Sequence, residues 1–213
     1  MTSVGDNLKA VRERIRNTGR DPDDVTIVAV TKGFSPEVCR QALDAGLKTL
    51  GENRVQEALS KMNEVEGAEW HLIGHLQRNK VKLIIGRFAL IQSIDSVHIA
   101  ESVAAIDSSQ PVLVEVNVAQ EPRKTGVEIG AAPAVIDQVA EILDLRGLMG
   151  MGPAVGDPTH AFERLRTFRD EAQQRLGRAL PILSMGMSGD FESAVKAGST
   201  MLRLGQILFG PRS

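Results

Sequence analysis

Lys32 is the residue of this chain whose chemistry is most specific. It follows almost directly on residues 25–30, Val-Thr-Ile-Val-Ala-Val, which form a mostly β-branched, apolar run. Such a run is typical of a parallel strand buried on both faces. An apolar surrounding disfavours the charged form of a lysine, and the neutral amine is a nucleophile that forms Schiff bases with carbonyl compounds. The alternative is a side chain that reaches water from the strand end.

Two Gly- and Ser-rich turns near the C-terminal end predict an anion site. Ser188, Gly189 and Asp190 open a helical pattern, where free backbone N–H groups can face an anion. Gly205 ends a short apolar run and lets the backbone approach a ligand closely. In α/β barrels, the loops after the seventh and eighth strands often form a phosphate site. The alternative is structural, with Ser188 as a helix cap and the glycines shaping turns.

Arg203 lies in a run whose alternation places Met201, Arg203 and Gly205 on one face and Leu202 and Leu204 on the other. A charged guanidinium on a buried face needs a partner, either a carboxylate or an acceptor on a ligand. An amine, an arginine and an anion site together fit a ligand with an aldehyde, a ring nitrogen and a phosphate. Pyridoxal 5′-phosphate has these three groups.

His71 and His75 are four residues apart, and Glu52 precedes them by one predicted strand, which raises the question of a metal site. However, His71 lies within a predicted strand, and the chain has no H-E-x-x-H motif and no third clustered histidine. We therefore expect no metal.

Short apolar runs alternate with helical patterns along the chain. The expected strands are residues 25–30, 49–52, 70–74, 90–94, 112–117, 145–150, 182–186 and 201–205. The expected helices are an N-terminal amphipathic segment and residues 36–46, 54–65, 77–85, 97–109, 131–143, 160–176 and 190–198. This alternation predicts βαβ units, and eight strands in this length favour a closed (β/α)₈ TIM barrel. The alternative, an open doubly wound sheet, normally carries a Gly-rich fingerprint after its first strand, and none is present.

A barrel of this kind places its site at the carboxyl ends of the strands. The polar residues at those ends are Lys32, Glu52, Asn53, Arg54, His75, Asn117 and Ser188. The longest irregular segment, residues 119–133, contains prolines and glycines that prevent a continuous helix.

Length and composition indicate the number of domains and exclude some classes of partner. The 213 residues fit one domain, residues 1–213, and 42% hydrophobic residues provide a core. The net charge of −2, without a basic run, argues against nucleic-acid binding. The single cysteine, Cys39, excludes an intrachain disulfide and suits a reducing compartment. The chain has no apolar signal region and no membrane-spanning run, so we expect a cytoplasmic protein.

In sequence, the chain resembles the pyridoxal phosphate homeostasis protein family (YggS-like or PROSC-like proteins) along nearly its whole length. The resemblance is carried by VAVTKGFSPE, LGENRVQEALSK, WHLIGHLQRNK, IQSIDS, VLVEVNVAQEPRKTGV, LRGLMGM and LSMGMSGDFESAVKAGSTMLRLGQILFG. It implies a single barrel similar to the N-terminal domain of alanine racemase.

The resemblance also implies roles for particular residues. Lys32 matches the lysine that carries pyridoxal phosphate as a Schiff base. Ser188 and the backbone at Gly205 match phosphate contacts, Arg203 matches the ring-nitrogen partner, and Asn53 matches a residue near the cofactor.

The absence of tyrosine favours a carrier over a racemase. Racemization needs two bases, and in alanine racemase the partner of the lysine is a tyrosine supplied with a second, β-rich domain. This chain has no tyrosine and no residues after 213 to build that domain. In addition, a cationic Arg203 would disfavour protonation of the ring nitrogen and so weaken the cofactor as an electron sink.

We therefore predict a monomeric, non-catalytic carrier or buffer of pyridoxal phosphate, which limits free aldehyde and passes the cofactor to apo-enzymes that depend on it. The alternatives are an amino-acid racemase or another pyridoxal-phosphate enzyme of the same barrel type, and a Schiff-base aldolase acting on a phosphorylated sugar.

Overall fold

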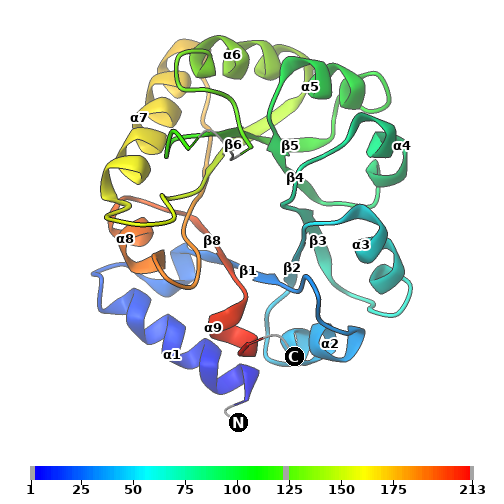
Figure 1. The fold of residues 1–213 in the computed structure, drawn as a ribbon, viewed down its shortest axis with the longest axis vertical. Helices are drawn as coiled ribbons and strands as arrows, with labels where there is room; N and C mark the ends of the chain where they lie inside the picture. The colour runs from blue at the N-terminus through cyan, green and yellow to red at the C-terminus, as the bar shows by residue number, and fades with distance from the viewer. Residues whose placement is uncertain (1–2, 122–124, 212–213) are drawn as a thin grey trace.

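The structure is a computed structural model that describes residues 3–121 and 125–211. Within these residues, eight parallel strands form a closed barrel in chain order, and β8 pairs with β1 (Figure 1). The strands are β1 Thr26–Val30, β2 Thr49–Glu52, β3 Glu69–Leu72, β4 Leu90–Ile94, β5 Pro111–Val116, β6 Asp144–Gly150, β7 Ile182–Ser184 and β8 Met201–Leu204. The predicted barrel is confirmed, with strand ends shifted by at most two residues.

Helices surround the barrel (Figure 1). They are α1 Val4–Arg16, α2 Pro36–Asp44, α3 Val55–Met62, α4 Val81–Ile84, α5 Val97–Ala104, α6 Ala132–Ile142, α7 Thr159–Leu176, α8 Phe191–Lys196 and α9 Gln206–Phe209, with 3₁₀ helices η1 Pro22–Asp24 and η2 Arg78–Lys80. Every helix expected from periodicity is present. The sequence analysis missed α9 and η1, because a segment of three or four residues is too short to display a helical period.

Helix α1 begins after the N-cap residue Ser3 and is hydrogen-bonded to the C-terminal part of the chain. Ser3 caps it by accepting a hydrogen bond from the Asp6 N–H, at 3.1 Å. Its Asn7 amide donates to the Leu208 carbonyl at 2.8 Å. Figure 1 shows α1 beside α8 and α9, so this helix covers the β8–β1 seam of the barrel.

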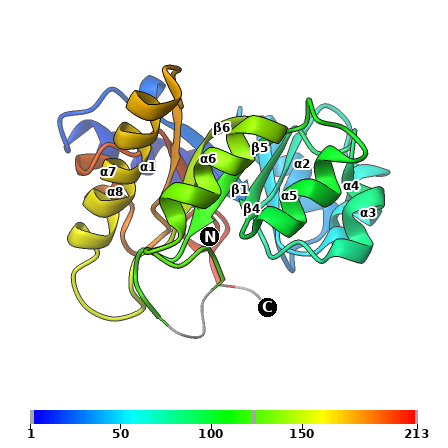
Figure 2. The same ribbon diagram turned by 90° about the horizontal axis from the view of Figure 1, so that it is seen from above.

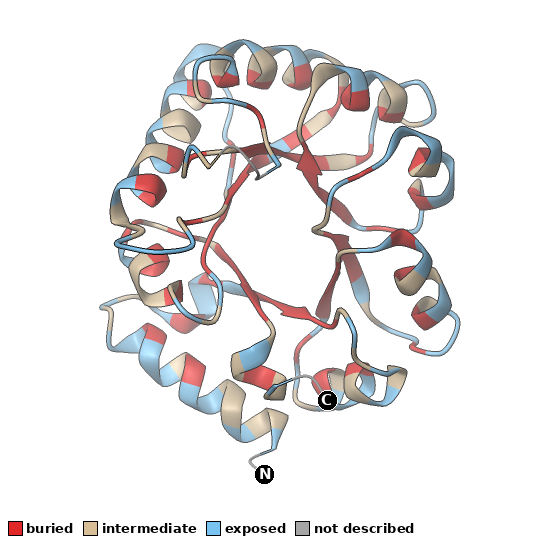
Figure 3. Cartoon of the chain, in the orientation of Figure 1, coloured by how far each residue is buried: buried red, intermediate tan, exposed pale blue. Residues whose placement is uncertain are grey.

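The core has two layers, because each strand is buried on both faces (Figure 3). Between strands and helices lies a large apolar layer that includes Leu202 and Leu204. Inside the barrel lies a smaller cluster, made of Val28, Leu90, Leu113, Met149 and Met201. The predicted alternation along β8 is therefore confirmed.

The loops after β5 and β6 project from the same end of the barrel (Figure 2). The described part of the β5 loop is irregular up to α6, as predicted. It is fastened back to β5, since the Val127 N–H donates to the Glu115 carbonyl at 2.8 Å and the Asn117 N–H donates to the Val127 carbonyl at 2.9 Å.

Candidate functional site

Lys32 lies in the turn that follows β1, at the carboxyl end of the barrel. Strand β1 is buried as expected, but Lys32 itself is only half-buried. Its neighbour Thr31 faces the helix layer, where the hydroxyl donates to Glu52 Oε1 at 2.6 Å. Lys32 belongs to this turn, because β1 ends at Val30.

Ser188 and Gly205 come together, although they follow different strands. The Ile207 N–H, in α9, donates to Ser188 Oγ at 3.2 Å. Among the described residues, no acceptor is found for the backbone N–H groups of Ser188, Gly189, Gly205 or Gln206. These N–H groups form a cradle of free donors where the two loops meet, which is the arrangement that binds an anion.

Helix α8 begins at Phe191, with Asp190 as its N-cap residue, so the alternative of Ser188 as the helix cap is wrong. The N–H groups of Asp190 and Phe191 both donate to the Met187 carbonyl, at 3.1 and 3.0 Å. Ser188 and Gly189 lie in the turn before the helix, and their N–H groups remain available.

Gly205 also has a structural reason to be glycine. A Cβ there would lie 3.2 Å from the Val30 carbonyl oxygen, closer than an ordinary contact. Gly205 and Gln206 open onto a cavity of about 250 Å³ that Phe34, Gly210 and Pro211 complete. Open space therefore borders the Gly205 and Gln206 side of the cradle, whereas Ser188 and Gly189 do not line this cavity.

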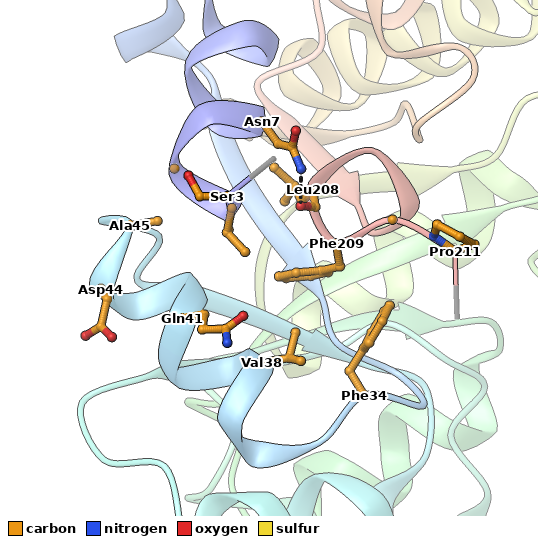
Figure 4. A pocket seen from close by; sticks show the side chains of 13 residues that line it. Ser3, Asn7, Phe34, Val38, Gln41, Asp44, Ala45, Leu208, Phe209 and Pro211 are labelled. Atoms are coloured by element: carbon orange, nitrogen blue, oxygen red, sulfur yellow. Dashed lines mark hydrogen bonds between the residues drawn. The ribbon is translucent and has the colours of Figure 1, made fainter. Parts of the chain in front are cut away.

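A larger hollow, of about 1090 Å³, lies outside the barrel between α1, α2 and α9 (Figure 4). The rings of Phe34 and Phe209 lie on one side of it, with centroids 5.2 Å apart. Of the predicted site residues, none lines this hollow.

Arg203 is buried inside the barrel, with 5% of its surface exposed. Its Nη1 donates to the Ser184 carbonyl at 2.9 Å and to Ser184 Oγ at 2.7 Å, and Nη2 donates to the Gly150 carbonyl at 2.9 Å. Burial lowers the pKa of Arg203 to about 10, against the opposing effect of the Glu115 and Asp190 carboxylates. The guanidinium stays charged at neutral pH. Its hydrogen-bond partners are neutral groups, where the sequence analysis expected a carboxylate or a ligand.

A chain of hydrogen bonds continues from Arg203 across the barrel interior. Ser184 Oγ donates to Gln92 Oε1 at 2.7 Å, and Gln92 Nε2 lies 3.0 Å from His71 Nδ1. Burial lowers the pKa of His71 to about 4, so the imidazole is neutral at pH 7 and Nδ1 accepts the amide proton. The sequence analysis missed Ser184 and Gln92, although each is a polar residue at an inward position of an apolar strand.

Glu115 lies at the end of β5 with 2% of its surface exposed. Burial raises the pKa of Glu115, opposed by a hydrogen bond from Thr125, whose Oγ1 donates to Oε1 at 2.6 Å. Arg203, Asp95 and His75 act on the same carboxylate through their charges. The sequence analysis missed Glu115, because it lies within a strand and not after its end.

His75 pairs with Asp95, with 2.8 Å between Nδ1 and Oδ2. Asn117, in contrast, holds its own loop, since its side-chain amide donates to the Glu121 carbonyl at 2.9 Å.

Asn53 supplies an unsatisfied acceptor, because its Oδ1 is buried and has no partner among the described residues. A buried acceptor left without a donor costs about 1–3 kcal/mol, so such atoms tend to mark a place for a ligand or water. Gly74 packs closely beside it, since a Cβ there would lie 2.3 Å from the Asn53 carbonyl oxygen.

In the described part of the chain, no group of three or more His, Cys, Asp or Glu side chains is arranged to hold a metal ion. Cys39 is buried in α2, and burial raises the pKa of its thiol. Among the described helices, none combines the length and apolar character needed to cross a bilayer.

Comparison with known proteins places these features in a family. The family model described as "Alanine racemase, N-terminal domain" matches residues 4–213. A curated pyridoxal phosphate homeostasis protein of Aquifex aeolicus is 40% identical, over 96% of this chain and 95% of that protein. Its namesake from Escherichia coli K12 is 34% identical, over 100% of this chain and 98% of that protein.

Solved structures of similar proteins have the same barrel fold. PipY of Synechococcus elongatus with pyridoxal phosphate bound has a TM-score of 0.85 at 31% identity and covers 98% of this chain and 100% of PipY. An alanine racemase from Corynebacterium glutamicum has a TM-score of 0.78 at 14% identity, covering 98% of this chain and 60% of the racemase. The second likeness shows the barrel fold alone.

Proposed function

Because this chain belongs to the pyridoxal phosphate homeostasis protein family, we propose that it binds pyridoxal 5′-phosphate reversibly at the carboxyl end of its barrel and acts as a carrier or buffer of that cofactor. The observation that carries the proposal is the cradle of free backbone N–H groups, formed by the turns at Ser188 and Gly205 at the barrel end that also bears Lys32.

The donors and acceptors at this end of the barrel fit the cofactor. When bound, pyridoxal phosphate supplies a reactive aldehyde together with a phosphate dianion. The Lys32 amine would hold the aldehyde, and the N–H groups at Ser188 and Gly205 would hold the phosphate. Arg203 would meet the ring nitrogen, and the unsatisfied Asn53 Oδ1 would accept a hydrogen bond nearby. The PipY structure with bound pyridoxal phosphate supports the choice of cofactor by likeness.

Two features support a carrier over an enzyme. Arg203 stays protonated, so it cannot give a proton to the ring nitrogen as an acid would, and its charge disfavours protonation there. The chain also lacks tyrosine as a second base. We place this carrier in the cytoplasm as a monomer built of one cofactor-binding domain, residues 1–213, with apo-enzymes that need the cofactor as its recipients.

Amino-acid racemization is the second candidate, and the His75–Asp95 pair favours it. A histidine oriented by a carboxylate is a common general base. Such a base could replace the missing tyrosine.

The test is a titration of purified protein with pyridoxal phosphate, followed by visible absorption, borohydride reduction and peptide mapping. We expect a visible band and a reduced adduct on Lys32, both lost in Lys32→Ala and kept in the control Lys9→Ala, whose side chain is 84% exposed. An adduct elsewhere with none on Lys32 would overturn the site. Loss of α-protons from an amino acid at a rate abolished by Lys32→Ala would favour the enzyme.

A further inference from the structure

A largely buried ionic cluster, made of Glu52, Glu57 and Lys61, contacts the turn that carries Lys32. Lys61 of α3 has 6% of its side chain exposed, and Glu52 of β2 has none exposed. Lys61 Nζ lies 2.6 Å from Glu52 Oε1 and 2.8 Å from Glu57 Oε1. Glu57 and Lys61 are four residues apart, so they share one face of α3.

This cluster holds the residues on both sides of Lys32. Lys61 Nζ donates to the Thr31 carbonyl at 2.7 Å, and the Thr31 hydroxyl donates to Glu52 Oε1. On the other side, the Gly33 N–H donates to Glu57 Oε1 at 2.5 Å. The backbone before and after Lys32 is thereby fixed to α3 and β2.

The turn has a conformation that needs such support. Gly33 has a φ of +74°, in the left-handed region that favours glycine. Glycine gives a flexible backbone unless contacts restrain it. The bond from Gly33 to Glu57 supplies that restraint at the residue that follows Lys32.

Opposite charges hold the cluster together. Lys61 hydrogen-bonds to both carboxylates, which raise its pKa above the ordinary value although burial opposes this. Hydrogen bonds from Lys61 and from the Gly33 N–H lower the pKa of Glu57, again against burial. The Lys61–Glu57 pair is therefore ionised at neutral pH, and Lys61 keeps Glu52 as a second partner.

We propose that Glu57 and Lys61 are positioning residues that hold the backbone of residues 31–33 and so fix the amine of Lys32 for reaction with the aldehyde of its ligand. This inference rests on the proposed function. A fixed amine reacts faster, because the entropy cost of placing it is met on folding.

The Glu57 series tests the proposal. Glu57→Ala removes both the charge and the acceptor for the Gly33 N–H, whereas Glu57→Gln keeps an acceptor. Glu66→Ala, an exposed glutamate just after α3, is the matched control. For each protein, the readouts are the rate of growth of the visible band with pyridoxal phosphate, the hydrogen-exchange rate of the Gly33 amide, and the unfolding temperature.

For Glu57→Ala we expect band growth slowed by about tenfold, because a flexible turn no longer presents the amine in one position. We expect faster exchange at Gly33, with partial recovery of both readouts in Glu57→Gln. Band growth and Gly33 exchange equal to those of Glu66→Ala would overturn the proposal. The double variant Glu52→Gln/Lys61→Met removes the buried pair together and should repeat the slow phenotype. If this double variant does not fold, the Glu57 series decides.

The experiment distinguishes failure of the proposed cofactor binding from failure of the proposed positioning role. If the wild-type protein gives no band, the cofactor assignment fails, but Gly33 exchange still reports on the turn without any ligand. If the wild type gives the band and Glu57→Ala matches it in rate and exchange, only the positioning role fails.

Discussion

At the scale of single residues, hydrogen bonds to strands β6 and β7 set the orientation of the Arg203 guanidinium. Its guanidinium donates to the Ser184 hydroxyl and to two backbone carbonyls, so its direction is set by neutral groups. Ser184 is itself held by Gln92, and Gln92 contacts His71. Ser184, and through it Gln92, thus helps to orient the guanidinium that we propose meets the ring nitrogen.

Ser184→Ala should weaken pyridoxal phosphate binding by about tenfold, since a hydrogen bond to a charged group contributes about 1.5 kcal/mol. The dissociation constant from a fluorescence or absorbance titration measures this. Ser102→Ala is the control, because its exposed hydroxyl donates only to the His98 carbonyl. Equal affinities for the two variants would show that Arg203 needs no support from Ser184.

His71 should make stability depend on pH. Burial lowers its pKa from 6.5 to about 4, so the unfolded chain binds a proton over a range where the folded protein does not. Stability from the neutral imidazole is therefore present above pH 6.5 and is lost as the pH falls towards 4, by at most about 3 kcal/mol.

The raised pKa values of the buried Glu52 and Glu115 act in the opposite direction, since their protonation at low pH favours the folded state. Comparison with a variant isolates the histidine. The free energy of unfolding of His71→Gln, from urea titrations, should fall less between pH 7 and pH 4.5 than that of the wild type. Parallel curves would contradict a buried neutral His71.

At the scale of elements, the pairing of β6 with β7 depends on a close backbone approach. A Cβ at Gly147 would lie 1.8 Å from the Ile182 carbonyl oxygen, and its φ of +155° is one that other residues rarely adopt. Both strands would have to separate to admit a side chain.

Gly147→Ala should lower the free energy of unfolding by about 3 kcal/mol or more, because overpacking against backbone cannot be relieved by a rotamer change. Gly130→Ala is the matched control, since no atom lies within 4 Å of a Cβ built there. Chemical denaturation measures both. A loss of less than about 1 kcal/mol for Gly147→Ala would mean that the two strands separate easily.

At the scale of the whole molecule, the closed barrel brings β8 beside β1 and so places the proposed site residues from both ends of the chain at one end of the barrel. Lys32 follows β1, whereas Ser188 and Gly205 follow β7 and β8. If the proposed ligand is held at all three positions, its release requires loss of the bond to Lys32 and of the contacts at Ser188 and Gly205.

A loaded carrier should give up its cofactor completely to an excess of apo-enzyme. The activity of a pyridoxal-phosphate-dependent apo-enzyme, mixed with the loaded protein, should rise to the level set by the cofactor supplied. The rate should stop increasing with apo-enzyme concentration once dissociation from the carrier limits it. Retention of the cofactor against excess apo-enzyme would contradict a carrier.

The sequence by itself determined the elements and the direction of Arg203. Apolar runs and helical periodicity depend on neighbours along the chain, so the strands, the longer helices and the alternation along β8 were readable without contacts. The order of strands and helices then favoured the barrel. The resemblance added the assignments of Lys32, Asn53, Ser188, Arg203 and Gly205, which remain predictions.

Only the tertiary structure decided which distant groups meet. Glu57 and Lys61 are an ordinary i, i+4 pair on a helix until α3 packs against the turn at Lys32. The chain from Arg203 to His71 joins strands β8, β7, β4 and β3 across the barrel interior. Such contacts depend on closure of the barrel and on strand register, which no local pattern encodes. For that reason they were absent from the sequence analysis.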